Sequence, residues 1–397
     1  MKNIIFAFLS LFFLQSSQAY IVKIVKDNHI SQPGYITTIQ EKNIQTTTVN
    51  KDGTKLYSVF RPYGGYCLNI VKLSSTINKA DSFTSCFDNQ YTVGNKVKKI
   101  ILTDKGKTFY TLSDNKILGY NISATTNTIE SKVYIQNYPQ KIIDAKLIDN
   151  DKYLYLITAS HTNQSGKLFI YEINPVGTLK KISIVPLSFK PEMVKFDDNN
   201  IYIQSDKSIY RYSFLTGDKL NKEKEIITIS SGEILDFSVF NESNTESKVV
   251  LAIQDNIANK NIEQGAVEVY KVSSSSSRLL YQEKYDDIPK EVALFKEKND
   301  SHGKVLVAFN HRYIIASFTN TYFEDANEYK IDGSFLRLLQ RDNLVEVVSS
   351  GSVSVIDMRH NKLLNELFLK NIDENSSFIS KSFIGFSNKD NINISQI

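Results

Sequence analysis

The stretch Ala145–Ala159, AKLIDNDKYLYLITA, carries the pattern that decides the fold of this chain. It contains an apolar strand, a polar turn rich in Asp and Asn, and a second strand with several apolar residues in succession. A third strand, KLFIYEI, follows at Lys167–Ile173. Short runs of aromatic and β-branched residues between turn residues are typical of β-strands. The stretch therefore predicts three consecutive antiparallel strands.

The same unit recurs along the chain. Its clearest other copies start at Thr46 (TTTVNKDGTKLYSVF), Lys99 (KIILTDKGKTFYTLS) and Met193 (MVKFDDNNIYIQS). In these four copies the second strand contains an apolar residue followed by a tyrosine, namely Leu56-Tyr57, Phe109-Tyr110, Leu154-Tyr155 and Ile201-Tyr202. Weaker copies start at Leu235, Val292 and Phe335. Seven units of one type predict a repeat architecture.

The period of the repeat indicates which architecture this is. The spacings lie between 39 and 56 residues if the following positions are equivalent: Leu56, Phe109, Leu154, Ile201, Val250, Leu306 and Val345. A fourth strand follows several of the third strands, for example KKISIV at Lys180 and LLYQEKY at Leu279. Four strands in about 40 to 55 residues are the signature of β-propeller blades. We predict an all-β propeller of seven to eight four-stranded blades, which forms a single domain over residues 20–397.

The two ends of the chain predict how the ring closes. The C-terminal FIGFSNKDNINISQI, from Phe383, is similar to the first two strands of a unit, with Ile392 continuing the series. YIVKIVK at Tyr20 and YITTIQEK at Tyr35 are similar to the last two strands. We expect these segments to pair into a composite eighth blade, because closure removes open sheet edges. Seven blades is the alternative, if one weak unit is not a blade.

The strand-turn-strand unit with its Leu-Tyr or Ile-Tyr pair, followed by strands such as KLFIYEI, resembles the YVTN or lactonase-like group of the β-propeller superfamily. The resemblance covers the whole chain after its first 19 residues as architecture and is loosely WD40-like. The chain has no Trp, so it lacks the Trp-Asp dipeptides of WD40 blades and the Trp docking positions of quinone-dependent dehydrogenase blades. By analogy of fold, the resemblance implies a lactonase-like hydrolase as one alternative function.

The N-terminus, MKNIIFAFLSLFFLQSSQAY, has the pattern of a secretory signal peptide. Lys2 provides a positive charge, Ile4–Leu14 is an apolar run, and Ser17 and Ala19 are small residues before a cleavage site. We predict a signal peptide over residues 1–19 and export to the periplasm or the extracellular space. No later segment reaches about 18 consecutive apolar residues, so we expect no membrane span in the mature chain.

The two cysteines support the same compartment. Cys67 opens the run CLNIVKL and Cys86 lies near the end of the run SFTSCF. If these runs form an antiparallel hairpin, the two residues fall opposite each other. An even pair in an exported protein predicts a disulfide. A free or redox-active pair is the alternative.

Charge and motifs argue against several classes of function. The 47 basic and 43 acidic residues are interspersed, whereas a nucleic-acid interface needs a concentrated basic face. The chain has no HExxH, GxSxG or Walker motif, and its five histidines lack metal-ligand spacing. The acidic runs at 149–151 and 197–200 could ligate Ca²⁺. They fall at the equivalent tight turn of two repeats, however, where Asp and Asn bond to the backbone. We predict no catalytic residue, no metal site, no cofactor and no nucleic-acid partner.

Three basic residues lie on strands that should line the channel of the propeller. Lys146 and Arg337 both precede the equivalent residues of their second strands by eight positions, and Lys195 lies close to the same place. If the three side chains point inward, the channel mouth would be basic and would favour an anionic ligand. The alternative is that they are ordinary polar positions. Asp236 and Glu291, on other candidate inner strands, weaken the prediction of a basic channel.

Together these features favour a non-enzymatic scaffold. Variable loops between rigid strands are where binding residues concentrate. We predict a monomeric module that engages a protein or peptide at one face of the ring. The alternatives are the lactonase-like hydrolase and a propeller that binds an anion or another small molecule in its channel.

Overall fold

The computed structural model describes most of the chain. The described residues are 23–25, 35–40, 43–62, 65–73, 82–87, 96–103, 107–368, 377–379, 383–388 and 391–396, with short gaps in the longest range at 163, 198, 217–218, 221–223, 244–245, 256–263, 274–275, 297–302 and 319–322. Their regular structure consists of β-strands, and none of their segments forms a helix able to cross a membrane. The predicted signal peptide lies outside the described residues.

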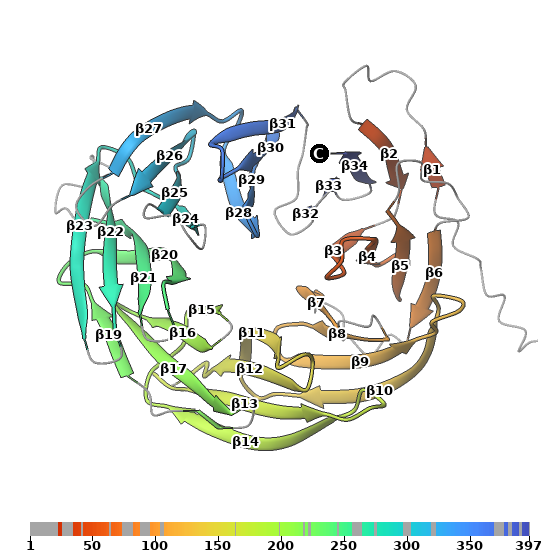
Figure 1. Cartoon of the computed structure of the whole chain (residues 1–397). Coiled ribbons are helices and arrows are strands. Elements are labelled where there is room, and N and C mark those ends of the chain that lie inside the picture. Colours follow the sequence, from red (N-terminus) through yellow and green to blue (C-terminus); the bar gives the residue numbers. More distant parts are fainter. Residues whose placement is uncertain are drawn as a thin grey trace, which may run out of the picture.

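The strands form eight antiparallel sheets arranged around a central axis, which confirms the predicted propeller and selects eight blades over seven (Figure 1). Blades 1 to 3 each use four consecutive strands, the first of which lies innermost. Blade 1 contains β3 (Ile44–Val49), β4 (Lys55–Phe60), β5 (Tyr66–Lys72) and β6 (Ser82–Phe87). Blade 2 contains β7 (Lys99–Leu102), β8 (Thr108–Leu112), β9 (Lys116–Ile122) and β10 (Ile129–Asn137). Blade 3 contains β11 (Lys141–Ile148), β12 (Tyr153–Ala159), β13 (Gly166–Ile173) and β14 (Leu179–Leu187).

Blades 4 to 7 repeat this plan. Blade 4 contains β15 (Met193–Phe196), β16 (Asn200–Ser205), β17 (Ser208–Thr216) and β19 (Lys224–Thr228), with the short β18 (Lys219–Leu220) also pairing with β17. Blade 5 contains β20 (Glu233–Asn241), β21 (Ser247–Gln254), β22 (Gly265–Val272) and β23 (Ser277–Tyr285). Blade 6 contains β24 (Glu291–Phe295), β25 (Gly303–Ala308), β26 (Arg312–Phe318) and β27 (Phe323–Lys330). Blade 7 contains β28 (Phe335–Arg341), β29 (Leu344–Ser349), β30 (Ser352–Asp357) and β31 (Lys362–Phe368).

The eighth blade is composite, as predicted, but its division between the two ends differs from the prediction. The C-terminal part supplies three strands, β32 (Ser377–Ile379), β33 (Phe383–Asn388) and β34 (Asn391–Gln396). The N-terminal part adds β2 (Tyr35–Gln40) and β1 (Lys23–Val25), in the order β1-β2-β34-β33-β32. Ile392 therefore lies on the third strand, and the prediction that it continues the series of second-strand residues was wrong. The innermost strand, β32, has the sequence SFI and is only three residues long. Its alternation is too short to predict a strand, so the sequence pattern indicates FIGFSN as the first strand of this unit.

Arg341 strengthens this closure. It ends the inner strand of blade 7, and its Nη1 donates to the carbonyl oxygen of Ile379 in blade 8 at 3.1 Å. Its Nη2 donates to the carbonyl oxygens of Asn50 and Lys51, in the first turn of blade 1. One side chain thus joins three successive blades across the junction of the two chain ends.

The hydrophobic core lies between the blades. Eight clusters of buried side chains fill the eight seams between neighbouring sheets in the described part of the ring. Leu56 packs in the seam with blade 8 and its neighbour Tyr57 in the seam with blade 2, and both are almost fully buried. Successive side chains of a strand point to opposite faces, and both faces of a blade are covered. The second strands are therefore apolar at consecutive positions.

Two of the residues that we took as equivalent are out of step by one position. Leu56 and Val345 face the preceding blade, whereas Val250 and Leu306 face the following one. A shift of one residue moves a side chain to the other face of its sheet. The copies that contain Val250 and Leu306 lack the apolar-Tyr pair that marks the register in the clear copies, so their predicted register is wrong by one residue.

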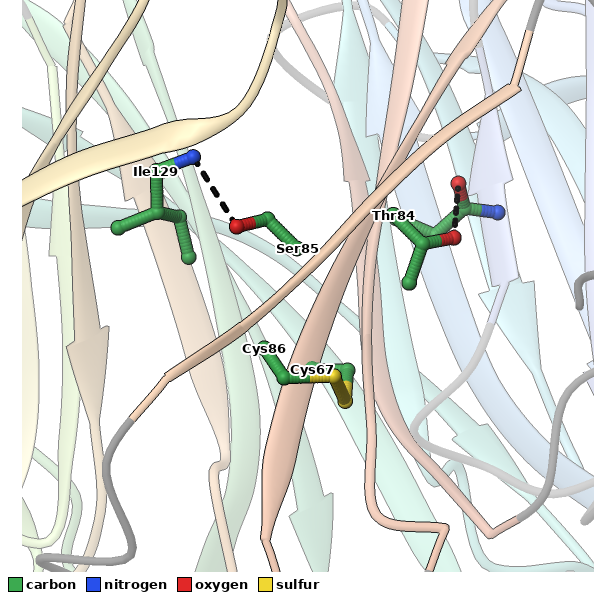
Figure 2. The surroundings of a disulfide bond; sticks show 6 residues. Cys67, Thr84, Ser85, Cys86 and Ile129 are labelled. Carbon is green, nitrogen blue, oxygen red and sulfur yellow. Dashed lines mark hydrogen bonds between the residues drawn. A yellow bond between two sulfur atoms is a disulfide. The ribbon is translucent and has the colours of Figure 1, made fainter. Parts of the chain in front are cut away.

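The disulfide is present at the outer edge of blade 1, as predicted. Cys67 on β5 lies opposite Cys86 on β6, with a Cα–Cα distance of 3.9 Å (Figure 2). Next to it, Ser85 Oγ accepts a hydrogen bond of 3.2 Å from the backbone N–H of Ile129. Because Ile129 begins the outer strand of blade 2, the strand held by the disulfide also contacts the next blade.

Candidate functional site

The candidate site is a cavity of about 720 Å³ in the central channel. It is bounded by the inner strands of four neighbouring blades, β15, β20, β24 and β28. The rim is formed by four residues that lie one or two positions after the ends of β24, β28 and β30, namely Lys296, Asp342, Asn343 and Arg359. The cavity therefore opens at the face of the ring where the inner strands end. Its volume is within the range of known ligand pockets, about 300 to 1,000 Å³.

Phenylalanines from three consecutive blades line this cavity. Phe196, Phe240 and Phe295 lie at or next to the ends of their inner strands, and all three are half-buried. Lys146 Nζ lies 5.8 Å from the ring centre of Phe196, and Lys296 Nζ lies 5.9 Å from that of Phe240. Aromatic side chains offer a large apolar contact area at low conformational cost. The cavity thus combines apolar surface with nearby cations.

Two carboxylates at the inner end of the cavity join neighbouring blades. Asp236 Oδ2 accepts from the backbone N–H of Val292 at 3.0 Å, and Glu291 Oε2 accepts from that of Leu338 at 2.7 Å. Burial, helped by the negative charge of Asp236, raises the pKa of Glu291 to about 7. Each carboxylate accepts a hydrogen bond from a backbone N–H on the inner strand of the following blade. These hydrogen bonds connect blades 5, 6 and 7.

The structure brings one of the three predicted basic residues into the cavity. Lys195 lines it, with Nζ 3.0 Å from Asp236 Oδ1 and 42% of its side chain exposed. Lys146, on the inner strand of blade 3, donates to the carbonyl oxygen of Phe196 at 3.5 Å. Arg337, on the inner strand of blade 7, donates to Ser377 Oγ at 2.6 Å. All three side chains reach the inner strand of the next blade, so they contribute to the contacts between blades.

The predicted equivalence of Lys146 and Arg337 was wrong. Lys146 lies opposite Tyr155, and Lys195 lies opposite Tyr202, so these two lysines occupy one repeat position. Arg337 lies opposite Val348, further from the turn. The turn between the first two strands is shorter in blade 7 than in blade 3. Eight residues counted back from the second strand therefore reach further along the first strand in blade 7.

Arg337 belongs to a buried polar contact between blades 7 and 8. Glu346, on β29, is fully buried and lies near Arg337 and Ser377. Burial raises the pKa of Glu346 to about 8, although the Arg337 charge and Ser377 act in the opposite direction. A carboxyl group therefore lies inside the seam that closes the ring.

The acidic runs at 149–151 and 197–200 lie in tight turns, as predicted. Asp197 Oδ1 accepts from the backbone N–H groups of Asn199 and Asn200, each at 2.7 Å. Asp149, Asn150 and Asp151 all have a positive φ, of 56°, 50° and 66°. Asp and Asn tolerate this conformation better than most residues. In the described part of the chain, no cluster of His, Cys, Asp and Glu side chains could hold a metal ion.

The phenylalanines and Lys296 were missed in the sequence. A signal was present, because three successive units carry an aromatic residue just before the turn that follows the first strand, in KFDD, VFNE and LFKE. Nothing in the sequence showed that these three strands lie side by side at the wall of one cavity. The three strands lie side by side because successive blades place their inner strands next to one another around the central channel.

Comparisons with known proteins agree on the fold. No family model matches the chain, and no curated protein matches its sequence. Among solved structures it is similar to the Dos1 propeller, with a TM-score of 0.62 at 10% identity over 91% of this chain and 94% of that one. BamB from Moraxella catarrhalis gives a TM-score of 0.55 at 10% identity, over 91% and 97% of the two chains. The WD40 domain of SCAP from fission yeast gives 0.56 at 11% identity, over 90% and 96%. With identities this low the likeness concerns the fold alone, and the chain is an eight-bladed β-propeller.

Proposed function

We propose that this chain is an exported, non-enzymatic binding module that takes a segment of another protein into the cavity on blades 4 to 7. The observation that carries the proposal is the cavity itself, with phenylalanines from three blades and charged side chains around one opening. Ligand pockets combine apolar and aromatic side chains with a few polar groups that fix the orientation of the ligand. The inner strands that carry these phenylalanines are paired within their blades, and this pairing positions the apolar surface.

The two carboxylates at the inner end of the cavity have a structural role between the blades, which is compatible with a binding module. Asp236 and Glu291 lie at the inner end of the cavity, and an oxygen atom of each accepts a hydrogen bond from a backbone N–H of the next blade. Asp236 also pairs with Lys195. These contacts hold the inner strands in register, which is a structural role.

Export is part of the same proposal. Disulfides persist mainly in oxidising compartments, and Cys67 and Cys86 form one in a chain whose N-terminus has the pattern of a signal peptide. The predicted site of action is the periplasm or the extracellular space. Fractionation of cells that express the full chain tests this part, because export removes residues 1–19 and shifts the measured mass.

Affinity capture tests the binding proposal. The mature protein, immobilised as bait, should retain a specific partner from an extract of its own compartment. Ser238→Trp, which fills the cavity from its wall, should lose that partner. Leu279→Thr, on the exposed outer strand of blade 5, should retain it and serves as the matched control. Equal retention by Ser238→Trp and the wild type would place the binding surface elsewhere and overturn the proposal.

A further inference from the structure

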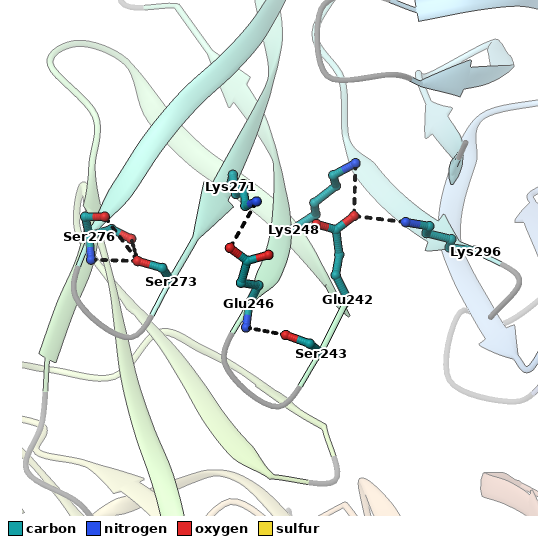
Figure 3. A network of polar contacts seen from close by, with 8 residues as sticks. All are labelled: Glu242, Ser243, Glu246, Lys248, Lys271, Ser273, Ser276 and Lys296. Atoms are coloured by element: carbon teal, nitrogen blue, oxygen red, sulfur yellow. Dashed lines mark hydrogen bonds and ion pairs between the residues drawn. The ribbon is translucent and has the colours of Figure 1, made fainter. Parts of the chain in front are cut away.

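Two lysines share one carboxylate at the rim of the cavity. Glu242 Oε1 lies 2.9 Å from Lys296 Nζ and 3.2 Å from Lys248 Nζ (Figure 3). The side chains of Lys248, Lys296 and Glu242 are 3%, 14% and 18% exposed. Burial tends to raise the pKa of Glu242, but the two ammonium groups outweigh burial and hold this pKa below its ordinary value. The three groups therefore carry a net charge of one positive unit.

Among the residues that the structure describes, the neighbouring charges do not cancel this surplus positive charge. Asp342 and Arg359 line the same end of the cavity and have opposite signs. Lys271, which lies beyond Lys248 in Figure 3, forms its own pair with Glu246 at 3.0 Å. A charge held in partly desolvated surroundings interacts with an opposite charge more strongly than it would in water. The Lys296 end of the cavity is thus suited to a group with one negative charge.

The rest of the cavity fixes where that group would lie. At the inner end, Lys195 balances the charge of Asp236, and Glu291 adds a negative charge when it is ionised, so this end does not attract an anion. Phe295 directly precedes Lys296, and Phe240 lies under the Lys296 ammonium. An apolar contact and a cation are therefore adjacent at the rim.

We propose that the cavity recognises a peptide segment in which an apolar side chain neighbours a carboxylate, and that this carboxylate lies beside Lys296. The inference rests on the proposed function and names the chemistry of its partner. A carboxylate matches the single surplus charge, whereas a doubly charged phosphate would leave one negative charge uncompensated. We expect this carboxylate on an Asp or Glu side chain, and the C-terminus of the peptide is tested as the other source.

Selection from a phage-displayed heptapeptide library on the immobilised mature protein tests this inference. Peptides enriched on the wild type should carry Asp or Glu next to an aromatic or aliphatic residue. On Lys296→Gln the acidic preference should disappear, and wild-type peptides should bind about tenfold more weakly, the size expected for one charge-assisted hydrogen bond. Lys296→Arg retains the charge and should retain the preference. Lys271→Gln removes a lysine outside the cavity and is the control.

The outcomes separate this inference from the proposed function. Enriched peptides without acidic residues, or an acidic preference that survives in Lys296→Gln, would overturn the inference and leave the binding function standing. If no peptide is enriched on any variant, both fail. Synthetic copies of an enriched peptide, with a free or an amidated C-terminus and with Asp replaced by Asn, identify which carboxylate is bound. Loss of affinity in neither copy would contradict the inference.

Discussion

Opening the Cys67–Cys86 bond should lower the stability of the propeller by about 3 kcal/mol. The bond closes a loop with a sequence separation of 19 residues, and the chain-entropy relation assigns about 3 kcal/mol at 25 °C to a loop of that length. In the folded state β5 and β6 are also paired on both sides of the bridge, for example Tyr66 with Phe87 and Leu68 with Ser85. Reduction should therefore destabilise the protein mainly by increasing the conformational entropy of the unfolded chain.

Thermal unfolding of the oxidised and reduced protein measures this difference. Unfolding entropy of about 2.1 cal/mol/K per residue gives roughly 0.8 kcal/mol/K for a chain of this size, so the expected fall in Tm is about 4 °C. The double variant Cys67→Ala/Cys86→Ala should unfold near the temperature of the reduced wild type and should not respond to reductant. The backbone N–H of Ile129, which donates to Ser85, should keep its protection from hydrogen exchange in the reduced protein.

Two results would refute this reasoning. A fall in Tm below about 1 °C would mean that the loop adds no measurable entropy to the unfolded chain. Rapid exchange at Ile129 after reduction would mean that β6 detaches, so the bond would be holding the folded state rather than restricting the unfolded one.

Three further predictions concern the closure of the ring. Between pH 6 and 8 the wild type should lose about 2 kcal/mol more stability than Glu346→Gln, because a carboxyl group whose pKa is raised from 4.5 to about 8 stabilises the fold when protonated and loses that contribution as the pH rises. Denaturant titrations at the two pH values measure this, and parallel pH dependence in both proteins would contradict it. Arg341→Met should cost about 1 to 2 kcal/mol in the same assay, because its charged hydrogen bonds reach blades 8 and 1, and an unchanged midpoint would count against that link. A chain that ends at Lys370 lacks β32–β34 and should be cleaved quickly by proteases at low concentration, and full resistance would refute the composite blade.

The architecture was predictable from the sequence because most strand pairs of a propeller join segments that are close together in the chain. Seven of the eight blades are sets of consecutive strands, so the turn in AKLIDNDKYLYLITA and the Leu154-Tyr155 pair are enough to reveal the unit. The pairing of Cys67 with Cys86 was also predictable, since both lie in one hairpin. Where the local marker was absent, at Val250 and Leu306, the register slipped by one residue.

The site depended on contacts between blades, which no single unit encodes. Lys146 and Arg337 looked alike by their distance from the second strand, yet different turn lengths place them at different heights in the ring. Lys296 shares Glu242 with Lys248 although 54 residues separate Lys296 from Glu242. Local sequence sets which residues form a strand, and short-range pairing fixes the blade. Which side chains meet in the channel is decided by the curvature of the closed ring, a property of all eight blades together.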